Sequence, residues 1–184
     1  MNCPVCKTIV LEASPLEENL IASTCAQCGG HWLTATDYEN WLALPSSATE
    51  VELTATSPIE VTDTPQAKLC PQCKRILTRY KVGHDMHFIL EHCSGCNGMW
   101  LDSGEWDNLK ANNLHRSLQK VPTAPWQREV RHSEHKKTMQ AFYTERFGED
   151  DYVEIQRIHA WLLERPQREM MLAYLAAEDP YKEK

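Results

Sequence analysis

The sequence predicts a small metal-stabilised α+β protein: two four-cysteine (Cys₄) ribbons, each followed by a short helix, and a C-terminal all-α segment of about three helices. Three observations predict it. The eight cysteines form four C-x-x-C pairs, the stretch around the second pair recurs 68 residues later, and apolar residues take a helical period after Pro125. At 184 residues with 42% apolar positions, the chain can form several small units that need help from metals.

The cysteine spacing predicts two metal sites. The four pairs are Cys3 and Cys6, Cys25 and Cys28, Cys70 and Cys73, and Cys93 and Cys96. The first two pairs are 18 residues apart and the last two are 19 apart, a separation typical of two turns that close around one ion. Four thiolates at about 2.3 Å suit tetrahedral zinc, so we predict two zinc ions. Iron in a rubredoxin-like site is the alternative.

The cellular setting follows from the same cysteines. The chain lacks the run of roughly 18 apolar residues that a membrane span needs, and Cys3 leaves no room for a signal peptide. We therefore expect a cytoplasmic protein without membrane contact, in which thiols stay reduced and serve as metal ligands rather than as disulfides. The net charge of −7 disfavours a general attraction to nucleic acid.

An internal duplication follows each second pair. The segment C-A-Q-C-G-G-H-W-L from Cys25 aligns with C-S-G-C-N-G-M-W-L from Cys93. Gly29 and Asn97 follow the last ligand, where a turn through positive φ is expected. Asp102 and Glu105 predict a capping box at the start of a helix over 104–119, with Asp102 accepting from the first-turn amides. Thr34 is the weaker counterpart, ahead of a helix over 37–44.

On these residues the chain resembles the bacterial transcription factor IIB-type zinc ribbon family, whose pattern is C-P-x-C followed by C-x-x-C-x-G-x-W-L-D-x-G-E. The second repeat matches it at Cys70, Pro71, Cys73, Cys93, Cys96, Gly98, Trp100, Leu101, Asp102, Gly104 and Glu105. The first repeat keeps the cysteines, Pro4, Gly30, Trp32 and Leu33 but has Thr34 and Thr36 in place of the Asp and the second Gly. The resemblance covers roughly residues 1–45 and 68–110. It implies zinc ribbons that carry a short helix, and nucleic-acid binding by analogy of fold.

The remaining segments complete the predicted domains. We assign ribbon 1 and its helix to 1–44, a linker to 45–67, ribbon 2 and its helix to 68–120, and a helical region to 121–184. The linker is rich in Ser, Thr, Pro and acidic residues and should let the ribbons move separately, unless Val51, Leu53, Ile59 and Val61 alternate onto a sheet edge. The helical region predicts helices over 126–147 and 152–164 and a third after Pro166.

Charge is segregated along the chain. Residues 1–65 carry −8, residues 66–137 carry +5 and residues 138–184 carry −4. A basic surface that binds RNA, DNA or an acidic protein face is one prediction, and a solvated helix face and hairpin edge is the alternative. Its candidate residues, the basic set, are Lys68, Lys74, Arg75, Arg79, Lys81, Arg116, Lys120, Arg128 and Arg131.

Enzymatic chemistry is disfavoured, because four cysteines close the coordination sphere and leave no position for a catalytic water or a small-molecule substrate. We predict a non-enzymatic zinc-binding adaptor or assembly and regulatory factor. It would dock a protein partner through the ribbons and the C-terminal helices, with Trp126, Trp161 and Met170 exposed. The alternatives are a nucleic-acid-binding regulator that uses the basic segment 66–137, and an iron electron carrier.

Overall fold

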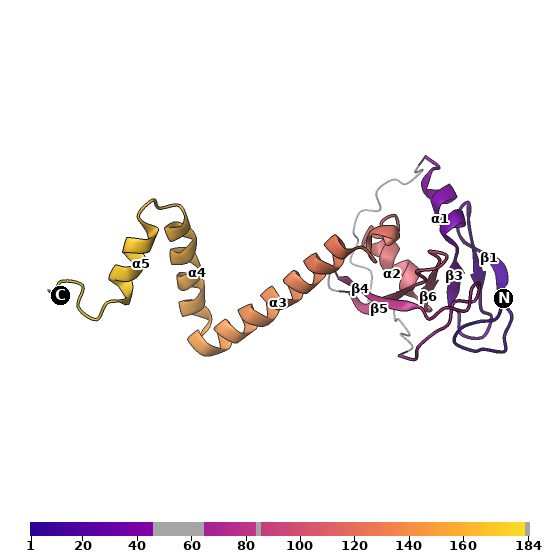
Figure 1. Ribbon diagram of the computed structural model, residues 1–184, viewed down its shortest axis with the longest axis horizontal. Coiled ribbons are helices and arrows are strands. Elements are labelled where there is room, and N and C mark those ends of the chain that lie inside the picture. The colour runs from indigo at the N-terminus through magenta and orange to yellow at the C-terminus, as the bar shows by residue number, and fades with distance from the viewer. Residues whose placement is uncertain (46–64, 84–85, 183–184) are drawn as a thin grey trace. The chain divides into compact units, whose positions relative to one another are not determined.

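The computed structural model describes residues 1–45, 65–83 and 86–182, except for the side chain of His87. The chain forms two compact units, Met1–Arg131 and His132–Lys184 (Figure 1). Most of the predicted linker, including Val51, Leu53, Ile59 and Val61, lies outside the described residues. Over the described part of the chain, no helix combines the length and apolar character that crossing a membrane requires.

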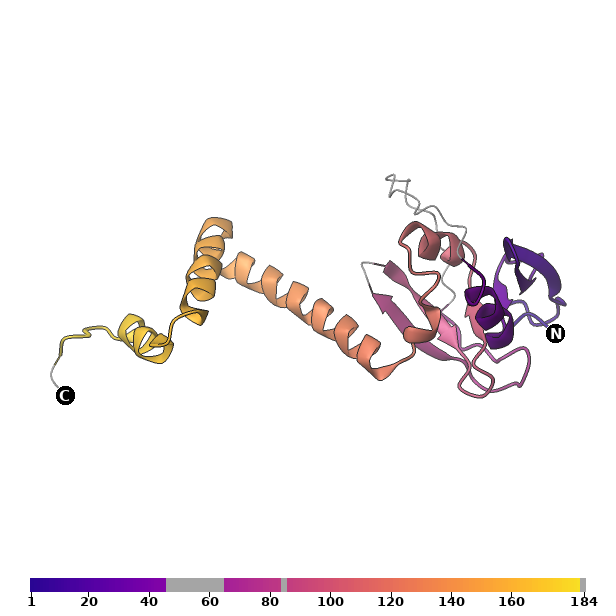
Figure 2. The same ribbon diagram turned by 90° about the horizontal axis from the view of Figure 1, so that it is seen from above.

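The first unit is built on one six-stranded antiparallel sheet (Figure 2). The strands are β1 (Glu12–Glu17), β2 (Leu20–Thr24), β3 (His31–Leu33), β4 (Thr78–Gly83), β5 (Met86–His92) and β6 (Met99–Leu101). Their order is β1-β2-β3-β6-β5-β4, so β3 of ribbon 1 pairs directly with β6 of ribbon 2. The expectation that the ribbons move separately is therefore wrong, because backbone hydrogen bonds join them into one sheet.

The seam between the ribbons has an internal two-fold symmetry. Its register pairs His31 with Leu101, Trp32 with Trp100, and Leu33 with Met99. A Cβ added at Gly30 would lie 2.2 Å from the indole of Trp100, and one added at Gly98 would lie 2.3 Å from the indole of Trp32. The tryptophan of each ribbon thus packs against the glycine of the other. The repeated Gly-x-Trp sequence supplies both halves of this contact.

The sheet buries a different core on each face, because side chains alternate along a strand. On one face, Trp32 and Trp100 pack with the cysteines, Leu11 and Leu77. On the other face, Leu33, Met99 and Leu101 join the core formed with the two helices that follow the ribbons. These helices are α1 (Ala35–Leu42) and α2 (Glu105–Ala111). Their Trp41 and Trp106 rings meet edge to face, with centroids 5.8 Å apart.

The two helix starts differ from expectation. Thr34 caps α1 by accepting a hydrogen bond from the Asp37 amide at 3.1 Å, and the helix begins two residues earlier than predicted. At α2, only half of the predicted capping box forms, in which Glu105 Oε2 accepts from the Asp102 amide at 2.9 Å. Asp102 does not cap, because its side chain is bound elsewhere, and Gly104 at φ 83° precedes the helix instead.

Helix α2 is also much shorter than the predicted 104–119. Asn113 adopts a left-handed φ of 56°, which Asn tolerates better than most residues, and the Leu114 amide bonds to the Leu109 carbonyl at 2.8 Å. After this stop the chain turns into the 3₁₀ helix η1 (Leu118–Lys120). The Tyr38 hydroxyl of α1 donates to the His115 carbonyl and accepts from the Leu118 amide, and so fixes the turn.

The three C-terminal helices are confirmed. They are α3 (Ala124–Phe147), α4 (Glu149–Leu163) and α5 (Arg168–Ala176). The start of α3 covers the edge strand β4: Trp126 Nε1 donates to the Val82 carbonyl at 2.9 Å, and Gln127 Nε2 donates to the Lys81 carbonyl at 2.8 Å. Val130 packs on Gly83. Trp126 is therefore half-buried in the first unit rather than exposed for docking.

Replacing Gly98 with Ala should destabilise the first unit, because the new methyl group overlaps the Trp32 indole. We expect a loss of about 2 kcal/mol in the free energy of unfolding of the metal-loaded protein, measured by denaturant titration. The matched control is Gly95→Ala, whose Cβ would meet only the flexible end of Arg75 at 2.8 Å. Equal stability of Gly98→Ala and Gly95→Ala would contradict the packing of each ribbon's tryptophan against the glycine of the other ribbon.

Candidate metal centres

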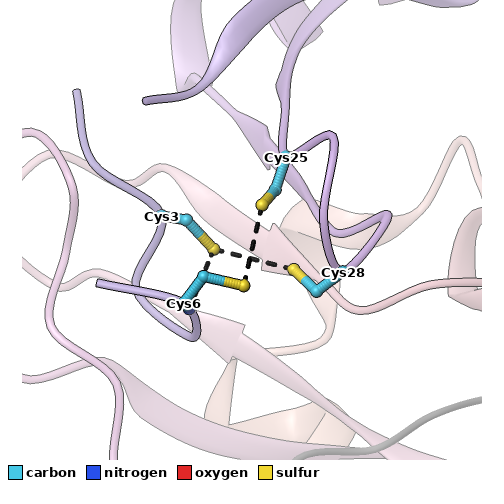
Figure 3. Close-up of side chains that lie close together, drawn as sticks. All are labelled: Cys3, Cys6, Cys25 and Cys28. Atoms are coloured by element: carbon cyan, nitrogen blue, oxygen red, sulfur yellow. Dashed lines mark hydrogen bonds between the residues drawn. The ribbon is translucent and has the colours of Figure 1, made fainter. Parts of the chain in front are cut away.

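The first centre gathers the four cysteines of ribbon 1 (Figure 3). The sulfur atoms of Cys3, Cys6, Cys25 and Cys28 all lie within 4.8 Å of one another. The Cys3 and Cys28 sulfurs are 3.6 Å apart, and those of Cys6 and Cys25 are 3.8 Å apart. A tetrahedron with metal–sulfur bonds of about 2.3 Å has edges of roughly 3.8 Å, so the spacing fits one metal ion.

The second centre repeats this arrangement in ribbon 2. The sulfur atoms of Cys70, Cys73, Cys93 and Cys96 lie within 4.8 Å of one another. Cys70 and Cys96 are 3.6 Å apart at sulfur, and Cys73 and Cys93 are 3.3 Å apart. Cys73 is exposed, whereas the other three are buried or half-buried. The structure thus brings all eight predicted ligands together in the two predicted sets.

Each ligand turn closes through a left-handed residue directly after its second cysteine. These residues are Lys7 (φ 64°), Gly29 (φ 70°), Lys74 (φ 63°) and Asn97 (φ 56°), and their amides bond to the carbonyls of Cys3, Cys25, Cys70 and Cys93. Gly29 and Asn97 were predicted. The two lysines were not, although the sequence C-P-x-C-K occurs in both repeats. A lysine in this conformation costs about 1 kcal/mol relative to glycine.

Backbone amides prepare one thiol in each centre for metal binding. Burial favours the neutral thiol of Cys25, but hydrogen bonds from the amides of Cys28 and Gln27, together with those of the Cys28 and Cys3 thiols, outweigh it and lower the pKa of Cys25 to about 7. The amides of Gly95 and Cys96 act in the same way against burial and lower the pKa of Cys93 to about 7. Burial raises the pKa of Cys70 to about 12. A metal cation fits such a site because it replaces these protons.

A buried ion network supports the second centre. Lys68 Nζ lies 2.6 Å from Glu91 Oε1 and 2.8 Å from Asp102 Oδ2. Burial opposes the charge of Lys68, yet its hydrogen bonds to Asp102 and Glu91 raise its pKa. Burial raises the pKa of Glu91 to about 7 against the attraction of Lys68. Lys68 is 2% exposed, so its predicted role in a basic binding surface is wrong.

The first ribbon has no such network. The aligned positions carry Met1, Ser23 and Thr34 in place of Lys68, Glu91 and Asp102. Asp102 Oδ1 also accepts from Trp100 Nε1 at 2.6 Å, whereas Trp32 Nε1 has no hydrogen-bond partner among the described residues. Sequence reasoning missed Glu91. The signal that could have revealed the network is that these three positions all carry charged side chains in the second repeat and uncharged ones in the first.

The basic set is divided by the structure. Arg116 is half-buried, with its guanidinium 4.6 Å above the Trp41 ring and a hydrogen bond to the Leu42 carbonyl. The other members lie on the surface at the second centre, on β4, on η1 and on α3: Lys74, Arg75, Arg79, Lys81, Lys120, Arg128 and Arg131. Among the predicted docking residues, Trp161 is 44% exposed and Met170 is 73% exposed.

Two four-cysteine centres, each held by a ribbon of strands with a short helix, define a tandem zinc ribbon architecture. The transcription factor zinc-finger family, whose domain is the TFIIB-type zinc ribbon, matches residues 2–44 and 69–112. The chain therefore carries two copies of this domain, and the resemblance predicted from the motifs is confirmed. No curated protein and no solved structure was found to match the chain.

Changing Cys73 to Ser should remove one of the two metal equivalents, because the second centre loses a ligand. The shared sheet transmits the loss, so amide NMR signals of ribbon 1 should shift together with those of ribbon 2. Elemental analysis and two-dimensional NMR of the full chain measure both effects. The control Ser94→Ala alters an exposed side chain of the same centre and should retain both metals. Unchanged ribbon 1 signals would contradict the coupling.

Glu105 predicts a pH dependence of stability. Burial raises its pKa to about 9, and the nearby charges of Asp102 and Glu91 add to this against the Asp102 amide bond. Its contribution to stability is therefore fully present below the ordinary value of 4.5 and is lost as the pH rises toward 9. The Glu105→Gln variant has no carboxyl group to ionise at this position. Its free energy of unfolding, relative to that of the natural protein, should therefore rise by roughly 1 kcal/mol per pH unit between about pH 6 and pH 9.

Thermal unfolding of the metal-loaded variant and the natural protein across this range measures that difference. Asp107→Asn changes an exposed carboxylate on the same helix and is the matched control. Parallel profiles for Glu105→Gln and the natural protein would show that Glu105 is ionised in the fold.

Proposed function

We propose that the protein is a non-enzymatic zinc-binding adaptor that docks a protein partner through its C-terminal helices. The supporting observation is the exposure of apolar side chains in the unit His132–Lys184. Among its described residues, only Leu162 is a buried large apolar residue. The exposed ones are Phe142, Tyr143, Phe147, Val153, Ile155, Trp161, Leu163, Met170, Leu172, Tyr174, Leu175 and Tyr181. Apolar surface on this scale is typical of an interaction site.

Local contacts order these helices without giving them a core. Tyr143 stacks on Phe147 with centroids 5.5 Å apart and on Tyr152 at 6.1 Å. The guanidinium of Arg165 lies 4.9 Å from the Trp161 ring. Such pairs contribute about 1 kcal/mol each, and a segment of this size needs a larger apolar core to be stable. A partner groove that covers these side chains would supply the missing burial.

The role of the metal in this proposal is structural. We propose zinc, because the matched domain is a zinc ribbon and four thiolates complete its preferred tetrahedral shell. A closed shell offers no site for a reacting water, which supports a non-enzymatic role. A reducing compartment such as the cytoplasm would keep the thiols available for the metal. A red colour of the native protein would instead indicate iron and electron transfer.

A protein partner is favoured over nucleic acid by the state of the basic set. Lys68 is buried in ion pairs, Arg116 is held on Trp41 and Arg79 lies 3.6 Å from Glu91, so at least three of the predicted cations are engaged within the fold. The net charge of the whole chain is −7. The exposed helices, by contrast, present aromatic and methionine side chains, which adapt well to protein surfaces.

Affinity capture with the full chain as bait tests the proposal. We expect a protein that is retained after nuclease treatment, retained by Lys74→Glu with Arg75→Glu, and lost with Trp161→Glu on α4. The matched control is Gln156→Glu, which changes the charge of the same helix by the same amount at an exposed polar position. Loss of the captured species with nuclease or with the Lys74 and Arg75 changes would favour the nucleic-acid regulator. Retention by Trp161→Glu would reject docking through α4.

A further inference from the structure

A cavity of about 390 Å³ lies in the first unit, between α1 of ribbon 1 and the ligand turn and strands of ribbon 2. Its lining includes Glu39, Tyr80, His92, Met99 and Gln119. It contains none of the eight cysteines and none of the exposed apolar residues of α4 and α5. The cavity therefore borders the second metal centre but shares no residue with the eight ligands or with the exposed apolar residues of α4 and α5.

The lining combines one acid with aromatic and apolar walls. Among the described residues that line the cavity, Glu39 is the only Asp, Glu, Lys or Arg. Gln119 Nε2 donates to Glu39 Oε1 at 3.1 Å and positions the carboxylate, which is exposed to solvent. The rings of Tyr80 and His92 meet edge to face at 6.2 Å, next to the buried Met99. A carboxylate beside aromatic rings attracts a flat cation, which can bond to the oxygens and stack on a ring.

The duplication supplies an internal comparison for this cavity. At the symmetry-related position, Asp107 aligns with Glu39 and His31 aligns with Met99. There His31 Nδ1 lies 2.9 Å from Thr24 Oγ1, and burial lowers the pKa of His31 against the attraction of Asp107. A Cβ added at Gly29 would lie 3.0 Å from the Ser103 hydroxyl, so the turn and helix are in close contact. The acid of this half therefore acts on a histidine ring of its own chain.

On the Glu39 side, the chain offers no such ring at the aligned position. Met99 replaces the histidine and contributes to the apolar core, with 1% exposure. Asn97 and Ala35 replace the Gly29 and Ser103 pair, and both line the cavity instead of closing it. Both halves thus carry the acid, but on the Glu39 side the histidine is His92 on the neighbouring strand, at the position of Thr24, and the cavity lies beside the acid.

We propose that this cavity binds an arginine side chain of a protein partner, with Glu39 bonding to the guanidinium and Tyr80 stacking against it. The site goes beyond docking through the C-terminal helices, because every residue of it belongs to the unit Met1–Arg131. Arginine fits better than lysine, since a planar guanidinium matches both the two oxygens of a carboxylate and the face of a ring. An isolated arginine should bind weakly, because the rest of the affinity would come from contacts with the remainder of the partner's surface.

An NMR titration of the metal-loaded full chain tests this site directly. The probe is N-acetyl-arginine amide, compared with N-acetyl-citrulline amide, which has the same shape without the charge, and with N-acetyl-lysine amide. We expect saturable shifts of the Ser94, Asn97 and Gln119 signals with the arginine probe. Affinity should fall about tenfold in Glu39→Gln, because a charge-assisted hydrogen bond is lost. Tyr80→Leu should weaken binding to a smaller extent.

The matched control is Asp107→Asn, which removes the equivalent acid on the other side of the seam and should leave binding unchanged. Equal binding of the citrulline probe, equal binding by Glu39→Gln, or no shifts at saturating probe would overturn the proposal. Equal binding of the lysine probe would overturn the assignment of a guanidinium. None of these outcomes depends on Trp161. If the arginine probe does not bind, docking through the C-terminal helices is still tested separately by affinity capture with Trp161→Glu.

Discussion

The contact of each tryptophan with the opposite glycine organises the first unit. Trp32 and Trp100 are fully buried at the only paired positions that lie on the symmetry axis of the seam, and neither could approach if its glycine carried a side chain. Because the indoles are flat and large, they fill the space between the ligand turns while the strands of the two ribbons hydrogen-bond. The shared sheet, both cores and the packing of α1 near α2 all follow from this close approach.

Local features of the fold were accessible from the sequence because they depend on short-range chemistry. The C-x-x-C spacing determines which sulfurs meet, and a periodic apolar pattern bounded by Gly148 and Pro166 delimits the C-terminal helices. The pairing of β3 with β6 was not accessible. Three-residue strands carry too little alternation to reveal a partner, and the long connecting segment favoured independent ribbons. The Gly-x-Trp repeat contained the information, but only the structure shows that each tryptophan packs against the other repeat.

Charged residues were the least predictable part. Lys68 stands in a basic stretch of sequence, and sequence position alone places it on the surface, where most lysines lie. Its burial depends on Glu91 and Asp102, which are 23 and 34 residues away. Asp102 was assigned to a helix cap for the same reason: the local pattern fitted, and the competing partner was remote. Long-range ion pairs of this kind become visible only when the strands that carry them are aligned.

The symmetry of the seam has a consequence for how the two halves find each other. A surface that is complementary to its own copy would ordinarily make association depend on the amount of protein in solution. Here both copies belong to one polypeptide, so the second encounters the first at an effective concentration set by the connecting segment and independent of dilution. Because the two copies need not be identical, either can differ in sequence while their pairing is retained. One carries a buried lysine network, and the other carries His31 at the position that is Met99 beside the cavity.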